Sequence, residues 1–103
     1  MSELYTFYFK IIYTERTFNL TFSPDATIKF FIESVNSTMH LLLEDDMDNQ
    51  IIEIVETGQY NNVNGRDPEL APKINYNDEY TLRDVYGHRV RNTAFYIRFV
   101  QQH

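Results

Sequence analysis

Residues 23–36 form the pattern of one amphipathic helix with its own start signal, directly after two strand-like segments. Asp25 or Thr27 can cap its first turn, because a side-chain oxygen there accepts from an unpaired backbone N–H, and Pro24 suits a helix start. Four apolar residues recur at the spacing that places them on one side of a helix: Ile28, Phe31, Ile32 and Val35. A hairpin followed by a helix that lies across it predicts half of a small α+β domain.

Alternation of apolar and polar residues predicts the strands of the hairpin at 4–12 and 17–22, joined by a loop of four or five residues. The first strand is expected to bury one set of side chains: Tyr5, Phe7, Phe9 and Ile11. The second is expected to point three side chains inward: Phe18, Leu20 and Phe22. Phe30 lies off the helix stripe, so either a later loop covers it or it is an exposed contact residue.

The rest of the chain predicts two further strands and a short helix. We expect the main helix to end between residues 36 and 38, where polar side chains compete with the backbone, and 39–43 fits either a helical turn or a short strand. Residues 51–55 and 94–100 are strands, with Phe95, Ile97 and Phe99 facing the core. Residues 60–80 form a long surface segment with at most one short strand near 73–76. A helical turn follows, with Thr81 as its cap and Gly87 as its end.

Length and composition limit the class of protein. A chain of 103 residues fits one domain, 1–103, which is long enough to bury a core without disulfides or bound metal ions. Cysteine is absent, which excludes disulfides and thiolate chemistry. No run of about 18 apolar residues or signal peptide is present, so we expect an intracellular protein, cytoplasmic or nuclear, without a membrane span. The net charge of −6 argues against nucleic acid and anionic lipid as partners.

Candidate chemical motifs fail on residue type or spacing, so we expect no enzyme activity, no cofactor and no metal. The acidic residues at 44–46 and 78–79 are expected in solvated loops. A calcium loop from Asp46 would need glycine at its sixth position, where Ile51 stands. The three histidines lack ligand spacing, and three scattered glycines make no phosphate loop. The basic residues at 88–91 are expected to be a solvated loop before the last strand.

Three local motifs occur in an order that resembles the ubiquitin-like β-grasp family. Ser-Pro-Asp-Ala-Thr-Ile at 23–28 is similar to the start of the ubiquitin helix. Ile-Glu-Ile-Val at 52–55 with Thr-Gly-Gln at 57–59 looks like the third strand and its turn, and Thr-Leu-Arg-Asp-Val-Tyr at 81–86 looks like the turn before the last strand. The resemblance covers most of the chain outside insertions at about 40–50 and 60–79. It implies a mixed sheet of four to five strands packed on one main helix, with the first and last strands adjacent and parallel at its centre.

Two departures from the family bear on function. Conjugated members end in Gly-Gly, and this sequence ends in Phe-Val-Gln-Gln-His, so we do not expect conjugation. The family's aliphatic recognition patch corresponds here to Val55, Tyr96 and Arg98, of which only Val55 is aliphatic. Recognition by ordinary ubiquitin-binding proteins is therefore not expected.

The outer face of the sheet is the expected contact surface, because tyrosine and arginine are enriched where proteins meet. Its alternative role is simple cross-strand cover, with Tyr8 beside Tyr96 and Lys10 beside Arg98. The predicted protein-binding residues are Tyr8, Lys10, Ile12, Val55, Tyr96 and Arg98. We expect a non-conjugated ubiquitin-like module that binds another protein non-covalently, with help from residues 60–79.

The alternative function is a structural or assembly subunit of a larger complex, which self-association would reveal. The residue usage, rich in asparagine, isoleucine, tyrosine and phenylalanine, is typical of an A+T-rich genome such as that of a virus, parasite or protist. A viral assembly protein, or a protein that imitates a ubiquitin-like protein of its host, is therefore compatible with the sequence.

Overall fold

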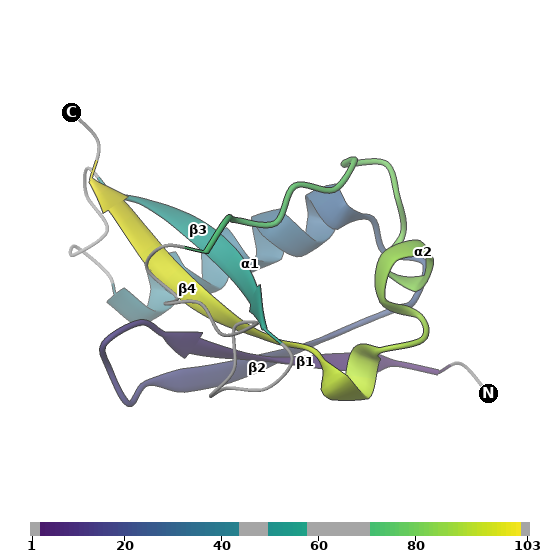
Figure 1. Ribbon diagram of the computed structural model, residues 1–103, viewed down its shortest axis with the longest axis horizontal. Coiled ribbons are helices and arrows are strands. Elements are labelled where there is room, and N and C mark those ends of the chain that lie inside the picture. Colours follow the sequence, from purple (N-terminus) through teal and green to yellow (C-terminus); the bar gives the residue numbers. More distant parts are fainter. Residues whose placement is uncertain (1–2, 44–49, 58–70, 102–103) are drawn as a thin grey trace.

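The computed structural model describes residues 3–43, 50–57 and 71–101 as one α+β unit (Figure 1). Its elements follow in the order β1 (Tyr5–Ile11), β2 (Thr17–Phe22), α1 (Ile28–Leu43), β3 (Gln50–Thr57), α2 (Leu82–Tyr86), the 3-10 helix η2 (Val90–Asn92) and β4 (Ala94–Gln101). The predicted acidic loop at 44–48 and most of the long segment at 60–80 lie outside the described residues.

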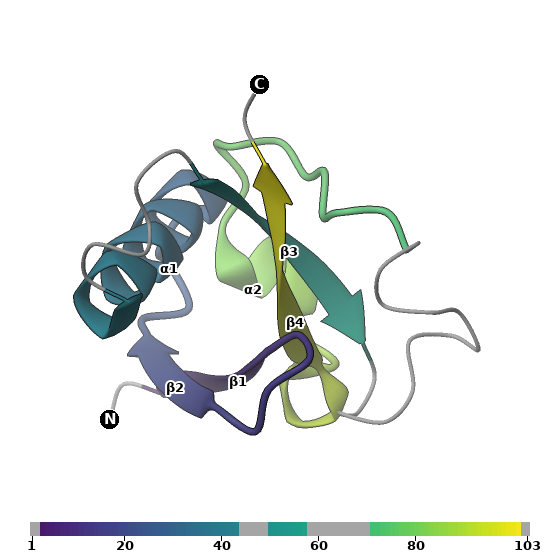
Figure 2. The ribbon, with the colours of Figure 1, turned by 90° about the vertical axis from the view of Figure 1, so that its left-hand side faces the viewer.

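The four strands form one mixed sheet in the order β2-β1-β4-β3. β1 and β4 are parallel neighbours at its centre, and β2 and β3 pair antiparallel with them at the two edges. The α1 helix lies against one face (Figure 2). The predicted α+β class, with a mixed sheet and one main helix, is confirmed, as is the central parallel pair. The described residues contain four strands, not a fifth.

Aromatic rings fill the space between the sheet and α1. Phe7 of β1, Phe31 of α1 and Phe95 of β4 are completely buried, and the ring centroids of Phe7 and Phe31 are 5.5 Å apart, edge to face. Phe9 stacks on Phe95 at 5.2 Å. Such pairs add to the free energy gained from burying their area. The residues of the first strand that the sequence predicted to be inside are all buried: Tyr5, Phe7, Phe9 and Ile11.

The α1 helix is longer than the sequence predicted. It continues through Asn36 and Thr38 to Leu43, so the predicted end at 36–38 is wrong and residues 39–43 are helical. Met39, one turn after Val35, is completely buried, which extends the apolar stripe. Thr38 donates its hydroxyl to the Ser34 carbonyl, 2.9 Å away, and so remains compatible with the helix. Burial on the core side outweighs the weak helix preference of the polar residues.

The start of α2 is tied to the start of α1. Thr81 caps α2, as predicted, and the structure adds a reciprocal hydrogen bond from the Thr81 amide to the Asp84 side chain. The Leu82 amide donates to the Ala26 carbonyl at 2.8 Å, and the Ile28 amide donates to the Tyr80 carbonyl at 2.8 Å. Gly87 is the residue after the helix, as predicted, and a Cβ there would lie 2.5 Å from the Arg83 carbonyl oxygen, so a side chain would require a shift. These bonds place residues 80–92 at the end of the molecule where β1 begins (Figure 1).

Residues 73–76, for which the sequence predicts at most one short strand, form none, and the Ile74 amide donates to the Ile54 carbonyl of β3 at 2.8 Å. The η2 turn, which the sequence analysis did not predict, connects α2 to β4. A three-residue turn has too short a pattern to be recognised from sequence.

Adjacent phenylalanines on α1 test this packing. Phe31→Ala removes a completely buried ring, so we expect it to lower the free energy of unfolding by roughly 3–5 kcal/mol. Phe30 is 53% exposed and meets Phe22 edge to face at 6.0 Å, so Phe30→Ala should cost less than about 1.5 kcal/mol. Urea denaturation of both variants measures the difference. Equal losses would contradict the orientation of α1.

Candidate binding surface

The six predicted binding residues belong to the sheet face opposite α1, but their cross-strand neighbours differ from the prediction. Phe95 and Ile97 face the core, so alternation turns Tyr96 and Arg98 to the outer face. Lys10 is level with Tyr96, and Tyr8 is level with Ala94. The predicted neighbours, Tyr8 beside Tyr96 and Lys10 beside Arg98, are wrong by two residues, because sequence alone does not fix the register of a parallel pair.

Exposure divides the six residues into three groups. Tyr8 is 48% exposed, whereas Val55 is completely buried and Ile12 retains 9%. The Lys10 side chain is mostly covered and lies 4.0 Å from Glu15. Tyr96 and Arg98 are partly buried. The expectation that all six side chains lie on open surface is therefore wrong for Val55 and Ile12, and the binding role of the set stays a prediction.

The segment that begins at Ala71 explains the covered half of this face. Ala71 is buried against Val55, and Tyr96 packs on the same small cluster. Arg98 donates two hydrogen bonds to the Glu53 carboxylate, at 2.6 and 3.0 Å, and one to the Ala71 carbonyl at 2.5 Å. These contacts give Arg98 a structural role. A long surface segment that folds back on the sheet carries no periodic signal, so the sequence did not reveal this cover.

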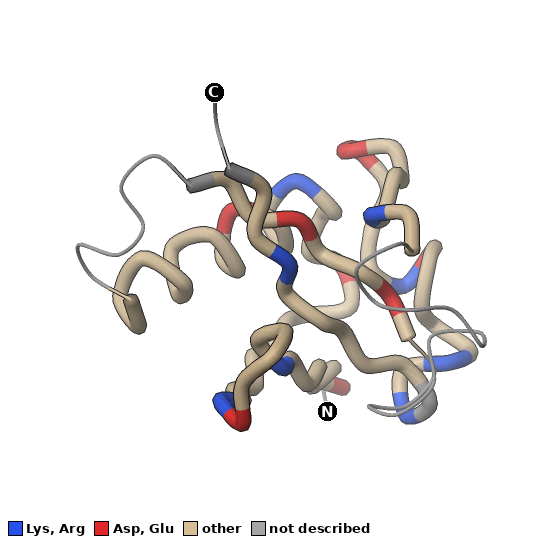
Figure 3. Tube along the Cα trace, turned by 60° about the vertical axis from the view of Figure 1, so that its left-hand side comes forward, with Lys and Arg blue, Asp and Glu red and all other residues tan. Residues whose placement is uncertain are grey.

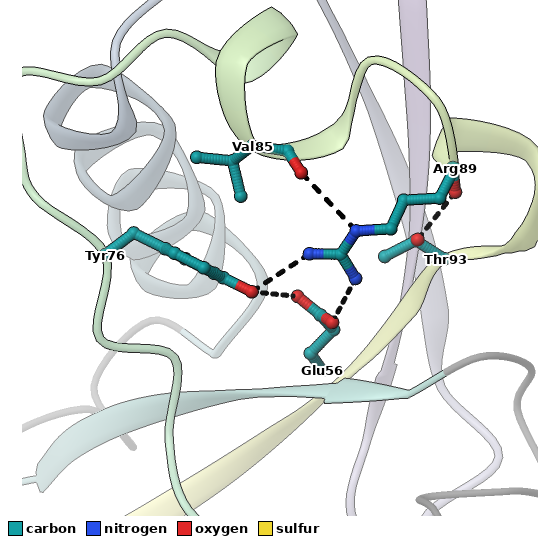
Figure 4. Close-up of polar contacts among 5 residues, drawn as sticks. All are labelled: Glu56, Tyr76, Val85, Arg89 and Thr93. Atoms are coloured by element: carbon teal, nitrogen blue, oxygen red, sulfur yellow. Dashed lines mark hydrogen bonds and ion pairs between the residues drawn. The ribbon is translucent and has the colours of Figure 1, made fainter.

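A polar cluster joins β3, the 71–79 segment and the turn after α2 (Figure 4). Tyr76 donates its hydroxyl to the Glu56 carboxylate at 3.0 Å and accepts from Arg89 at 3.0 Å. Arg89 forms an ion pair with Glu56 and donates to the Val85 carbonyl at 3.4 Å. The Thr93 hydroxyl donates to the Arg89 carbonyl at 2.6 Å. Three segments distant in sequence are thus held together by mutually satisfied groups.

The ionisation of this cluster follows from its partners. Burial raises the pKa of Tyr76, and the Glu56 charge adds to this effect. Burial lowers the pKa of Arg89, but hydrogen bonds to Glu56 and Tyr76 outweigh it and raise the pKa overall. Burial, with the nearby Glu56 charge, raises the pKa of Tyr86 above its ordinary range. The Tyr86 hydroxyl has no hydrogen-bond partner among the described residues. Glu56, Tyr76 and Arg89 therefore hold β3, the 71–79 segment and the turn after α2 together, and these three residues are called the clamp.

A groove of about 810 Å³ lies beside this clamp, between the start of β1 and the turn at 87–91. Thr6 and Tyr8 line one wall, and His88, Arg89 and Arg91 line the other. The prediction that 88–91 is a solvated loop is wrong for Arg89, which is partly buried in the clamp, and holds for the exposed His88 and Arg91. The groove brings the most exposed of the six predicted residues next to the chain's basic cluster.

The described part of the chain has neither a candidate metal site nor a candidate membrane span. It contains no group of three or more histidine, aspartate or glutamate residues placed to hold a metal ion. Nor does any helix within it have the length and apolar character needed to cross a membrane.

A second, smaller hollow of about 210 Å³ lies between α1, β3 and residues 73–78, with Ile32 and Ile52 in its lining.

Removal of one hydroxyl tests the clamp. We expect Tyr76→Phe to lower the free energy of unfolding by about 1–2 kcal/mol, because Glu56 and Arg89 each lose a hydrogen-bond partner in a partly buried site. Tyr80→Phe is the matched control, since Tyr80 is 51% exposed, and should change it by less than about 0.5 kcal/mol. Chemical denaturation measures the free energy of unfolding of both variants. Equally small losses in Tyr76→Phe and Tyr80→Phe would contradict a stabilising role of the clamp.

Alkaline unfolding tests the buried Tyr86 hydroxyl. Because the pKa of Tyr86 is raised in the folded state, the unfolded state loses this proton first, and stability should fall as pH rises above the ordinary value of 10.0. In Tyr86→Phe the free energy of unfolding should decrease less steeply with rising pH. At neutral pH the substitution should change it by less than about 1 kcal/mol, since the hydroxyl has no hydrogen-bond partner among the described residues. Denaturation between neutral pH and about pH 11, with Tyr80→Phe as control, measures both. An unchanged alkaline slope in Tyr86→Phe would contradict the assignment.

Comparisons with known proteins give no relative from which a role could be carried over. No family model, no curated protein and no solved structure matches this chain.

Proposed function

We propose that this chain is a ubiquitin-like β-grasp module that binds another protein non-covalently. The observation that carries the proposal is the central parallel pair β1–β4, with β2 and β3 outside it and α1 packed across one face. The family resemblance implies this arrangement, and a capped short helix before the last strand, which α2 provides, adds to it.

The open half of the outer face supports a binding role. Tyr8 presents about half of its surface there, and its neighbours on β2, Thr17, Asn19 and Thr21, are also exposed. The Thr6 and Thr21 hydroxyls pair at 3.0 Å across the two strands. An aromatic side chain on a rigid sheet loses little conformational entropy on binding, and tyrosine is a frequent energetic centre of interfaces. We therefore propose that contact centres on Tyr8, away from the covered Val55 and Arg98.

A second candidate function is an assembly subunit, and one feature favours it. Ile51 and Val100 are directly paired on the outer face of β3 and β4, and both side chains are exposed. An exposed apolar pair at the end of a sheet suits contact with a second copy or with another subunit.

Substitution of Tyr8 tests the proposed function. We expect a protein captured by this chain, from lysate of the cells that encode it, to bind Tyr8→Ala at least about tenfold more weakly, the loss typical of a central interface tyrosine. Tyr80→Ala, which removes a tyrosine of nearly equal exposure, should bind within about twofold of the original. Titration calorimetry with the identified protein measures both constants, and circular dichroism checks the fold.

Two outcomes would contradict this proposal. A partner bound equally by Tyr8→Ala and Tyr80→Ala would show that Tyr8 is not its contact. Retention of no partner, together with self-association in analytical ultracentrifugation that Ile51→Ser with Val100→Ser abolishes, would favour the assembly subunit instead.

A further inference from the structure

The groove between β1 and the turn at 87–91 has His88, Arg89 and Arg91 on one wall and a single acidic residue, Glu3, on the other, in a chain of net charge −6. Acidic and basic positions are interspersed along the described trace (Figure 3). Of the eight lysine and arginine residues that the structure describes, five pair with carboxylates: Lys10, Lys73, Arg83, Arg89 and Arg98. Arg91 has no ion pair within the described residues, and it lies on the groove with His88.

The basic wall of this groove is fixed before any ligand arrives. Arg89 is held on both sides, its guanidinium by Glu56 and Tyr76 and its carbonyl by Thr93. The Arg89 amide also donates to the Tyr86 carbonyl at 2.8 Å. His88 and Arg91 flank this anchored residue, so their backbone positions are set by the clamp. A wall ordered in advance lowers the entropy that binding must offset.

The opposite wall combines apolar and hydrogen-bonding groups. Leu4 is 61% exposed and Tyr8 is half-exposed at this wall, and Val90 packs against the core beneath. Glu3 lies on the same wall and would repel a ligand carboxylate placed beside it. Carboxylates are therefore favoured on the side of Arg91, and an apolar side chain is favoured beside Leu4 and Tyr8.

We propose that this groove binds an extended acidic peptide segment of a partner protein. Arg91 and His88 donate hydrogen bonds to its carboxylates, and an apolar side chain of the segment packs on Tyr8. This inference rests on the proposed protein-binding function and names the chemistry of the partner. A peptide fits better than nucleic acid, because a peptide can confine its carboxylates to the side of Arg91, whereas a phosphate backbone carries a negative charge at every nucleotide and would also pass Glu3.

Selection from random peptides displayed on phage, each of about 12 residues, tests the inference without a known partner. Selection on the original chain should enrich aspartate and glutamate around one apolar or aromatic residue. His88→Gln with Arg91→Gln should abolish this enrichment. His40→Gln with Arg16→Gln is the matched control, because it replaces the same two residue types at exposed positions outside the groove lining and should preserve the enrichment.

Affinity measurements make the result quantitative. The most enriched peptide, labelled with fluorescein, should bind the groove variant at least about tenfold more weakly and the control variant within about twofold. Its affinity for the original chain should fall as salt rises from about 50 to 200 mM. Amide chemical shifts in the ¹⁵N-labelled chain should change at residues 4–8 and 87–91.

Four results would overturn the inference. These are the absence of acidic enrichment, equal loss in both double variants, chemical-shift changes confined to other elements, and tighter groove binding by a 20-nucleotide single-stranded DNA than by the selected peptide. The proposed function is judged separately. If a captured partner depends on Tyr8 while no acidic peptide is selected, the acidic-peptide inference fails and the proposed function stands.

Discussion

The parallel pairing of β1 with β4 is the constraint on which the rest of the molecule depends. Strands from the two ends of the chain become neighbours, so everything between them must return to the sheet. Phe9 and Phe95 stack across this pair and cover it on the α1 side. β1 and β4 each have a neighbouring strand on both sides where residues 8–11 pair with 94–97, and β2 and β3 are left as the edges. The pairing also separates the two faces, one packed on α1 and one directed outward.

The path by which the chain returns to β4 determines which part of the outer sheet face is covered and where the groove lies. Residues 71–79 run beside β3, and α2 and η2 then bring the chain to the start of β4. The polar clamp of Glu56, Tyr76 and Arg89 fixes this route, and it does so with groups that are satisfied by one another. One result is that Val55 is covered by Ala71. Another is that the basic turn lies against the beginning of β1, where the groove forms.

Tyr8 connects the proposed function with the inferred partner chemistry. It belongs to the outer face of the sheet and to the groove at the same time. An exposed aromatic ring beside cationic groups can contact a mixed apolar and acidic segment, because the ring contributes buried area while the charges contribute orientation and selectivity. Arg98, although it was predicted as a contact residue, serves the fold by binding Glu53 and the Ala71 carbonyl. Residues proposed to contact a partner and residues that stabilise the fold therefore share one face of the sheet.

The sequence by itself determined the elements whose side chains repeat with a clear period. The buried set of β1, the α1 stripe from Ile28 to Val35 and the Thr81 cap of α2 could all be read from local patterns, because burial and capping impose spacing on neighbouring residues. The resemblance to a known family, and not periodicity, gave the order of the central strands. Only the tertiary structure decided the end of α1, the register of Tyr8 and Lys10 against β4, the burial of Val55 and the clamp around Arg89. Each of these depends on contacts between segments far apart in the chain, and such contacts leave no periodic signal in any one segment.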